Sequence, residues 1–166
     1  MPFTPIHFGV GALAKAAAPK RFSFQAFALS QVLMDIEPGV RLWRGDAILH
    51  GPSHTWAGAV LIAVATCLVW SLWELFGPRR YVRKVPLHGL LAAAFCGTLT
   101  HVVLDGMMRG DMPYTWLREW RLATPAYPGG AAVPELICLA AAVLATALLV
   151  IRDVTRRLWR REQVEH

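Results

Sequence analysis

The chain has few charged residues for its length. Of its 166 residues only 17% are charged and 55% are hydrophobic, and the mean hydropathy is +0.41. A typical soluble domain carries about 25% charged residues. This balance excludes an ordinary soluble domain and predicts a single integral membrane domain.

Cysteine is also scarce, and basic residues are missing from the start of the chain. The three cysteines, Cys67, Cys96 and Cys138, lie in apolar stretches. An odd number in such stretches argues against a disulfide framework and against thiolate metal ligands.

No lysine or arginine precedes Lys15, whereas a cleavable signal peptide begins with basic residues. We therefore expect no cleaved signal peptide.

Long apolar runs are abundant instead. Three windows, 55–76, 87–107 and 131–151, have about the ~20 residues needed to cross the hydrocarbon core. Two shorter segments, 5–17 and 24–36, precede them. About 13 residues rise only ~20 Å as a helix, so these segments are predicted to pack on the longer helices, or to be tilted or partly inserted. The sequence thus predicts an all-α integral membrane bundle of about five helices, two short and three long.

Basic residues gather on one side of this predicted bundle. If the five segments alternate in direction, most of the 17 Lys and Arg residues fall on one side, in loops 15–21 and 79–84 and in a tail, 152–166, that follows the membrane domain, 1–151. The positive-inside rule puts that side in the cytoplasm. The pattern predicts a multi-pass protein of a bacterial-type inner membrane, with a cytoplasmic C-terminus. The tail is interpreted as a topology anchor, and no nucleic-acid partner is expected.

Two prolines predict where helices begin. Pro5 suits the first helical position, which puts His7 in the first turn of the first helix. Pro52 suits the same position and puts His54 in the first turn of the third helix. His50 then lies in the loop just before it.

Other residues predict where helices end. Ser23 suits the N-cap of the second helix, and Pro38 with the glycine after it predicts the end of that helix, which puts Asp35 in its last turn. Gly106 suits a C-cap directly after Asp105.

Four of these helix ends meet at one membrane face of an up-and-down bundle. They carry three histidines and two carboxylates: His7, Asp35, His54, His101 and Asp105. Ionisable groups at membrane depth are costly unless they are paired, coordinated or facing water. Imidazole and carboxylate bind Zn²⁺, Mn²⁺ and Fe²⁺. The sequence therefore predicts a site for one or two such divalent ions, zinc ahead of the others, towards the outer face.

Two further residues are candidates for catalysis by proton transfer. Glu37 follows Asp35 by two, so both reach one site only if the helix ends near Ile36; otherwise Glu37 is a solvated loop acid. His50 precedes a Gly-Pro break and can act as a ligand, as a hydrogen-bond donor to a ligand, or as a proton donor to a leaving group.

The order of four short motifs resembles the YdjM-type inner-membrane proteins, described as membrane-bound metal-dependent hydrolases. The motifs lie in the first 110 residues and are H-x-x-x-G from His7, MDIEP around Asp35, HGPSHT from His50 and HVVLD from His101. The family often has P-D-I-D, whereas Met34 precedes Asp35 here and Glu37 replaces the second aspartate. The resemblance implies metal-dependent hydrolysis.

The expected function is metal-dependent hydrolysis at the membrane–water boundary, with membrane lipids as partners and a lipid or lipid-linked phosphoester or ester as substrate. A non-catalytic scaffold or regulator braced by metal is the alternative. A transporter is disfavoured, because the ionisable residues cluster at one face and the cytoplasmic halves of the helices offer no polar continuation.

Overall fold

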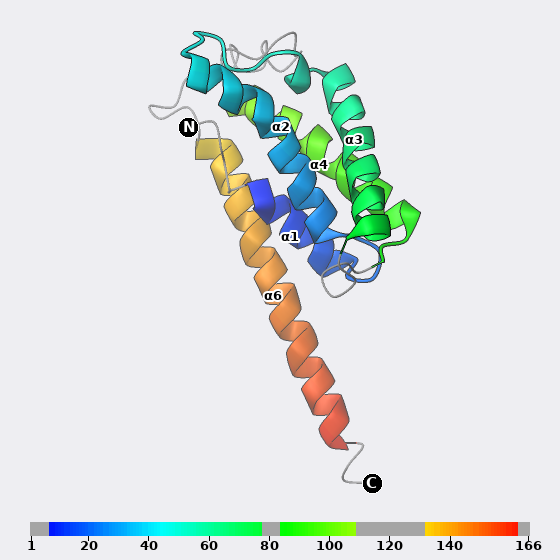
Figure 1. The fold of residues 1–166 in the computed structure, drawn as a ribbon. Coiled ribbons are helices and arrows are strands. Elements are labelled where there is room, and N and C mark those ends of the chain that lie inside the picture. Colours follow the sequence, from blue (N-terminus) through cyan, green and yellow to red (C-terminus); the bar gives the residue numbers. More distant parts are fainter. Residues whose placement is uncertain (1–6, 78–83, 109–131, 163–166) are drawn as a thin grey trace.

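The computed structural model describes residues 7–77, 84–108 and 132–162, and this part of the chain is 85% helical without strands. Its five α-helices, shown in Figure 1, are α1 (Phe8–Ala17), α2 (Phe24–Arg44), α3 (Trp56–Phe76), α4 (Leu87–Met108) and α6 (Ala132–Glu162). A 3₁₀ turn, η2 (Pro52–His54), precedes α3. The predicted all-α bundle of about five helices is confirmed.

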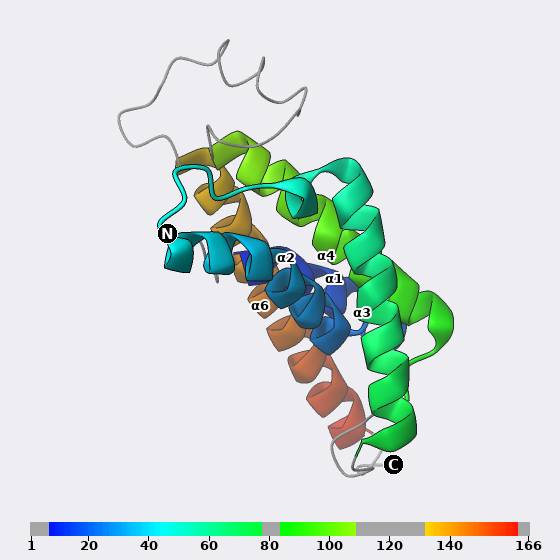
Figure 2. The same ribbon diagram turned by 45° about the horizontal axis from the view of Figure 1, so that its top comes forward.

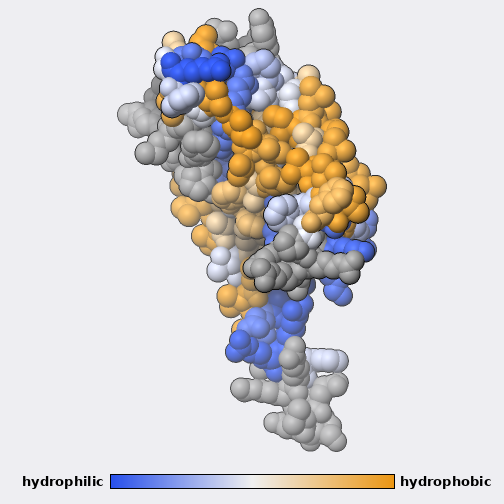
Figure 3. Space-filling model, viewed as in Figure 1, coloured by the Kyte–Doolittle hydropathy of each residue, from blue (hydrophilic) through white to orange (hydrophobic). Residues whose placement is uncertain are grey.

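Three helices are long and apolar enough to span a membrane. The candidate spans are Trp56–Phe76, Leu87–Met107 and Leu136–Arg157. Large apolar side chains on α3 and α6 are exposed, and Figure 3 shows hydrophobic surface over α3 and hydrophilic surface at the C-terminal ends of α2 and α6. Lipid would cover such apolar surface, so the helices fit a membrane protein.

The prediction for the end of the second helix was wrong. Helix α2 continues through Pro38 to Arg44 and has 21 residues. An interior proline removes a backbone hydrogen bond and crowds the carbonyl one turn earlier, at a cost of about 3 kcal/mol or more. Packing can offset that cost, and Pro38 is buried. The helix ends at Gly45, whose φ of 77° is the left-handed conformation of a C-cap. Asp35 therefore lies in the middle of α2, and α2 is not one of two short helices.

The start of α3 also differs from the prediction. His54 belongs to η2 rather than to the first turn of α3, because Thr55 is extended and interrupts the helical backbone. The Thr55 hydroxyl accepts a hydrogen bond from the Gly58 N–H at 3.0 Å, which makes Thr55 the N-cap of α3. Ser23 caps α2 in the same way, as predicted.

Two further helix ends lie beyond their predicted positions. Gly106 is inside α4, which continues to Met108, so Asp105 is not at the helix end. Helix α6 continues to Glu162, so most of the predicted tail extends the last span as helix. It projects past the other helices in Figure 1. Pro5 lies outside the described residues.

Glycines bring the helices of the bundle close together. A Cβ on Gly9 of α1 would overlap the Cys138 carbonyl of α6, and one on Gly97 of α4 would overlap the Ser30 hydroxyl of α2. Figures 1 and 2 both show α1 lying along α6. The close approach of α2 and α4 sets the distance across which the polar side chains described next meet.

Candidate metal centre

Six ionisable side chains from separate segments meet inside the bundle. All six residues are buried, and none is more than 6% exposed as a whole residue. His7 is the N-cap of α1, and Asp35 lies on α2. His50 lies just before η2, His54 is the last residue of η2, and His101 and Asp105 lie one turn apart on α4. The structure thus brings together all five ligands predicted from the sequence and adds His50.

Asp105 lies at the centre of this cluster. Its Oδ2 is 3.3 Å from His101 Nε2. The same oxygen is 3.5 Å from the Nε2 atoms of both His50 and His54. Its Oδ1 is 3.8 Å from His7 Nε2. Four imidazoles therefore direct the same ring nitrogen at one carboxylate.

A second carboxylate faces the cluster from α2. Asp35 Oδ1 is 3.4 Å from His101 Nε2, so that imidazole lies between two carboxylates. Five buried atoms here, Asp35 Oδ1, His54 Nε2, His101 Nε2 and both Asp105 oxygens, form no hydrogen bond with the described residues. Native interiors rarely leave buried polar atoms unsatisfied because each costs free energy. Bound metal would give these atoms partners.

The spacing of the donor atoms matches that of metal ligands. Two ligands about 2.1 Å from a tetrahedral metal ion lie about 3.4 Å apart. The contacts to Asp105 Oδ2 and Asp35 Oδ1 span 3.3 to 3.5 Å. The donors fall into three overlapping triads, each within 4.8 Å: His7, His101 and Asp105; Asp35, His54 and His101; and His50, His54 and Asp105.

Gln31 fixes the orientation of the His101 ring. Its amide nitrogen donates to the Gly97 carbonyl at 2.8 Å, so its carbonyl oxygen is the atom that lies 2.6 Å from His101 Nδ1. Nδ1 must therefore carry the hydrogen and donate. In the neutral ring this leaves a lone pair on Nε2, facing the two carboxylates. That lone pair and those oxygens would repel each other without a cation between them.

Ser53 plays a similar part for His54. Its hydroxyl lies 2.8 Å from His54 Nδ1, which directs Nε2 towards Asp105. Burial lowers the pKa of His54, against the opposing effect of Asp105, and so favours the neutral ring that metals bind. Gln31 and Ser53 thus support the ligands from outside, as is usual for metal-binding histidines.

Glu37 lies outside the cluster and holds the turn that carries His54. One carboxylate oxygen accepts the Ser53 N–H at 2.8 Å, and the other accepts Arg41 Nε at 2.9 Å. Burial opposes ionisation of Glu37, but the bonds from Ser53 and Arg41 outweigh it and lower the pKa below its usual value. Because α2 does not end near Ile36, Glu37 and Asp35 point in different directions. A role for Glu37 in proton transfer stays a prediction.

Sequence reasoning missed Gln31 and Ser53. Gln31 precedes Asp35 by one helical turn, so the two lie on the same face of α2. A buried glutamine one turn before a predicted ligand, in an otherwise apolar segment, was the available signal. Ser53 is adjacent to His54, but adjacency in the chain does not show which way a hydroxyl points.

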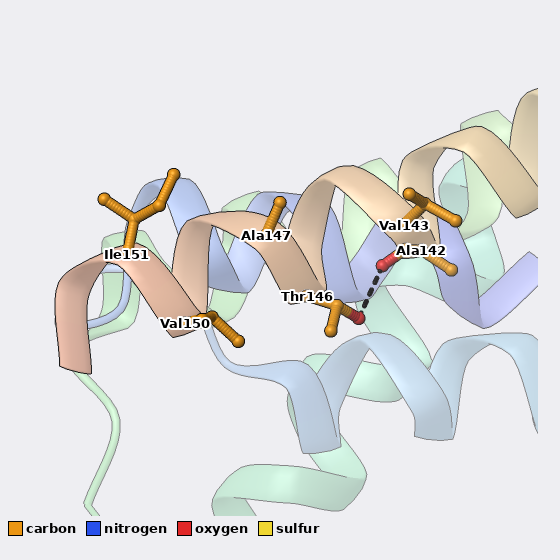
Figure 4. A pocket seen from close by; sticks show the side chains of 6 residues that line it. All are labelled: Ala142, Val143, Thr146, Ala147, Val150 and Ile151. Carbon is orange, nitrogen blue, oxygen red and sulfur yellow. Dashed lines mark hydrogen bonds between the residues drawn. The ribbon is translucent and has the colours of Figure 1, made fainter. Parts of the chain in front are cut away.

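A shallow depression on the surface of α6 is separate from the metal centre. Figure 4 shows its lining, all from α6: Ala142, Val143, Thr146, Ala147, Val150 and Ile151. Its volume is about 580 Å³. The Thr146 hydroxyl already donates to the Ala142 carbonyl at 2.9 Å. The depression lies within a candidate span and offers no ionisable group, so the chemistry belongs to the cluster.

Comparison with known proteins adds no assignment. No family model matches the chain, and neither the curated proteins nor the solved structures contain a match.

Proposed function

We propose that the protein is a membrane-embedded, metal-dependent hydrolase. The observation that carries the proposal is the convergence of six buried histidine and aspartate side chains in one cluster. With neutral histidines the cluster holds two negative charges, from Asp35 and Asp105. A buried pair of like charges is very costly, and a divalent cation would neutralise it.

Zinc is the proposed metal, ahead of manganese and iron. The donors are imidazole nitrogens and carboxylate oxygens, which zinc accepts readily. The three cysteines are free, and none belongs to the cluster. The described donors therefore provide no thiolate. Imidazole and carboxylate ligands also suit manganese and iron, so these two metals stay behind zinc as alternatives.

The residues around the metal would prepare a water molecule for attack. A bound divalent ion lowers the pKa of its water from about 16 towards about 7 and polarises the bond to be broken. Hydrolysis would transfer the OH of a water molecule to the phosphorus or acyl carbon and the other proton of that water to the leaving oxygen, as the bond to that oxygen breaks. Asp35, whose side chain is 9% exposed against 1% for Asp105 and His101, is the ligand best placed to meet water.

His50 fits the role of ligand better than that of proton donor. Its Nε2 lies 3.5 Å from Asp105 Oδ2 and its ring centre 4.7 Å from that of His54. The catalytic roles predicted for His50 and Glu37 remain predictions. The contacts of Glu37 support a positioning role instead, through the backbone of Ser53.

A lipid or lipid-linked phosphoester or ester is the proposed substrate. The cluster lies between helices that include two candidate spans, α3 and α4. A substrate with chains in the hydrocarbon region and a reactive bond near its boundary would suit this position. We further propose a bacterial-type inner membrane, with the basic end of α6 in the cytoplasm. The motif order that resembles YdjM-type proteins supports the same activity.

One observation favours a second function. Every ligand candidate is at least 94% shielded from solvent, and structural metal sites are closed whereas catalytic sites keep an open position. A metal that only braces α1, α2, η2 and α4 in a scaffold or regulator would need no access. Turnover distinguishes the two functions.

Elemental analysis of the purified protein is the first test. Wild type should contain stoichiometric metal, and the variants His101→Ala and Asp105→Ala should lose it. His88→Ala is the matched control, because His88 is exposed at the start of α4. A folded wild type without metal, even after incubation with Zn²⁺, Mn²⁺ or Fe²⁺, would overturn the proposal.

Activity is the second test. Hydrolysis of phosphodiester and ester lipids should require metal and be lost in the same two variants. Metal binding without turnover on any lipid of the panel would favour the scaffold.

A further inference from the structure

The six donors are spread over more space than one ion occupies. All ligands of a single octahedral ion, about 2.1 Å from it, lie within about 4.2 Å of one another. The described donors instead divide into three overlapping triads, and no group unites all six within 4.8 Å. His7 and His50 in particular fall into different triads, which share only Asp105.

The two oxygens of Asp105 face different histidines. Oδ1 faces His7, at 3.8 Å from its Nε2. Oδ2 faces His50 and His54, each at 3.5 Å from its Nε2, and also His101, at 3.3 Å. A carboxylate with one oxygen facing His7 and the other facing His50 and His54 has the geometry of a bridge between two metal ions.

Asp35 lies between the same two groups. Asp35, His54 and His101 form one triad. In that triad His101 also belongs to the triad of His7, and His54 also belongs to the triad of His50. Its Oδ1 is 3.4 Å from His101 Nε2. Both carboxylates of the cluster therefore stand between two pairs of histidines.

We infer that the centre holds two divalent ions bridged by the Asp105 carboxylate. One ion is held by His7 and His101, the other by His50 and His54, and Asp35 is the second carboxylate between them. This inference rests on the proposed metal site and deepens it. A bridged pair suits hydrolysis, because two ions about 3.5–4 Å apart can bind the attacking and the leaving oxygen together.

Metal stoichiometry tests the inference. Purified wild type saturated with Zn²⁺ and then freed of excess ion should contain two equivalents per chain. His7→Ala and His50→Ala should each retain one equivalent, because each removes a ligand of a different ion. Asp105→Ala should lose both, and His88→Ala should keep both.

Manganese provides a readout that does not depend on the variants folding. Two Mn²⁺ ions that share a carboxylate bridge are magnetically coupled, so the electron paramagnetic resonance spectrum of wild type with two equivalents of Mn²⁺ should differ from that of isolated Mn²⁺. One equivalent at saturation, or two with uncoupled spectra, would overturn the bridged pair and leave the proposed metal site standing. No bound metal at all would overturn both.

Discussion

The two ends of the α2, α3 and α4 bundle have cores of opposite character, one apolar and one ionisable. Where α2 and α4 begin and α3 ends, the core is apolar and consists of Phe22, Ala26, Phe27, Trp70, Leu90 and Ala93. Away from this apolar core lies an ionisable core that contains Asp35 of α2, His54 of η2, and His101 and Asp105 of α4. A second, smaller apolar cluster on the same three helices consists of Met34, Ala59 and Val102.

The difference lies in what each core needs to be stable. The apolar core is filled by side chains that pack against one another, and Phe27 is fully buried there. The ionisable core contains two carboxylates surrounded by histidines, and buried polar atoms of both kinds of residue have no hydrogen-bond partner among the described residues. Packing alone does not offset that cost. We therefore expect one core to be stable without a ligand and the other to depend on metal.

The largest effect should come from removing the central carboxylate. Asp105→Asn keeps the size of the side chain but removes its charge, so the protein should bind no metal and unfold at a lower temperature. Phe27→Ala should cost about 3–5 kcal/mol of stability through the cavity it leaves, yet keep its metal. Metal content and thermal unfolding, with and without a chelator, check both variants.

The chelator separates the two cores directly. It should lower the unfolding temperature of wild type and of Phe27→Ala, because removal of a ligand bound only by the folded state destabilises that state. It should leave Asp105→Asn unchanged. An equal chelator effect on all three proteins would show that the ionisable core is stable without metal.

A smaller effect is expected from Gln31, which lies beside the ionisable core without belonging to it. Gln31→Leu keeps a side chain of similar size but removes the acceptor of His101 Nδ1 and the donor to the Gly97 carbonyl. Loss of such a hydrogen bond to a metal-bound histidine lowers metal affinity about 10- to 100-fold. Competition with a chromogenic chelator measures the change.

The control for Gln31 lies on the same helix. Gln25→Leu makes the same substitution at an exposed position of α2 and should leave metal affinity unchanged. Equal affinities for Gln31→Leu and wild type would mean that the hydrogen bond to His101 does not orient a ligand.

Much of this arrangement follows from local sequence. Apolar windows of about 20 residues predicted α3 and α4 to within a residue or so, because helix length is set by the thickness of the hydrocarbon core. Alternation of the helices predicted that His7, Asp35, His54, His101 and Asp105 would meet. That step assigned each residue to one end of a helix, and the residues meet even though Asp35 lies in the middle of α2 and His54 lies before α3.

The course of α2 could not be predicted in the same way. Pro38 is a local signal for a helix end, but the burial of that residue against the rest of the bundle is a property of the fold. The continuation of α2 separates Glu37 from Asp35 and turns Glu37 towards Ser53. The positions of Gln31 and His50 likewise depend on the separation of α2 and α4 and on a loop conformation, neither of which sequence spacing specifies.

The smallest effect is expected from Ser53, whose hydroxyl supports His54. Ser53→Ala removes the partner of His54 Nδ1 but keeps the backbone N–H that Glu37 accepts. Ser53 is only partly buried, so water can take the place of the hydroxyl, whereas it cannot readily replace the buried Gln31. We expect a loss of metal affinity below about tenfold, at the low end for such contacts. Ser53→Thr keeps the hydroxyl and should bind metal like wild type, and a larger loss for Ser53→Ala than for Gln31→Leu would contradict this ranking by burial.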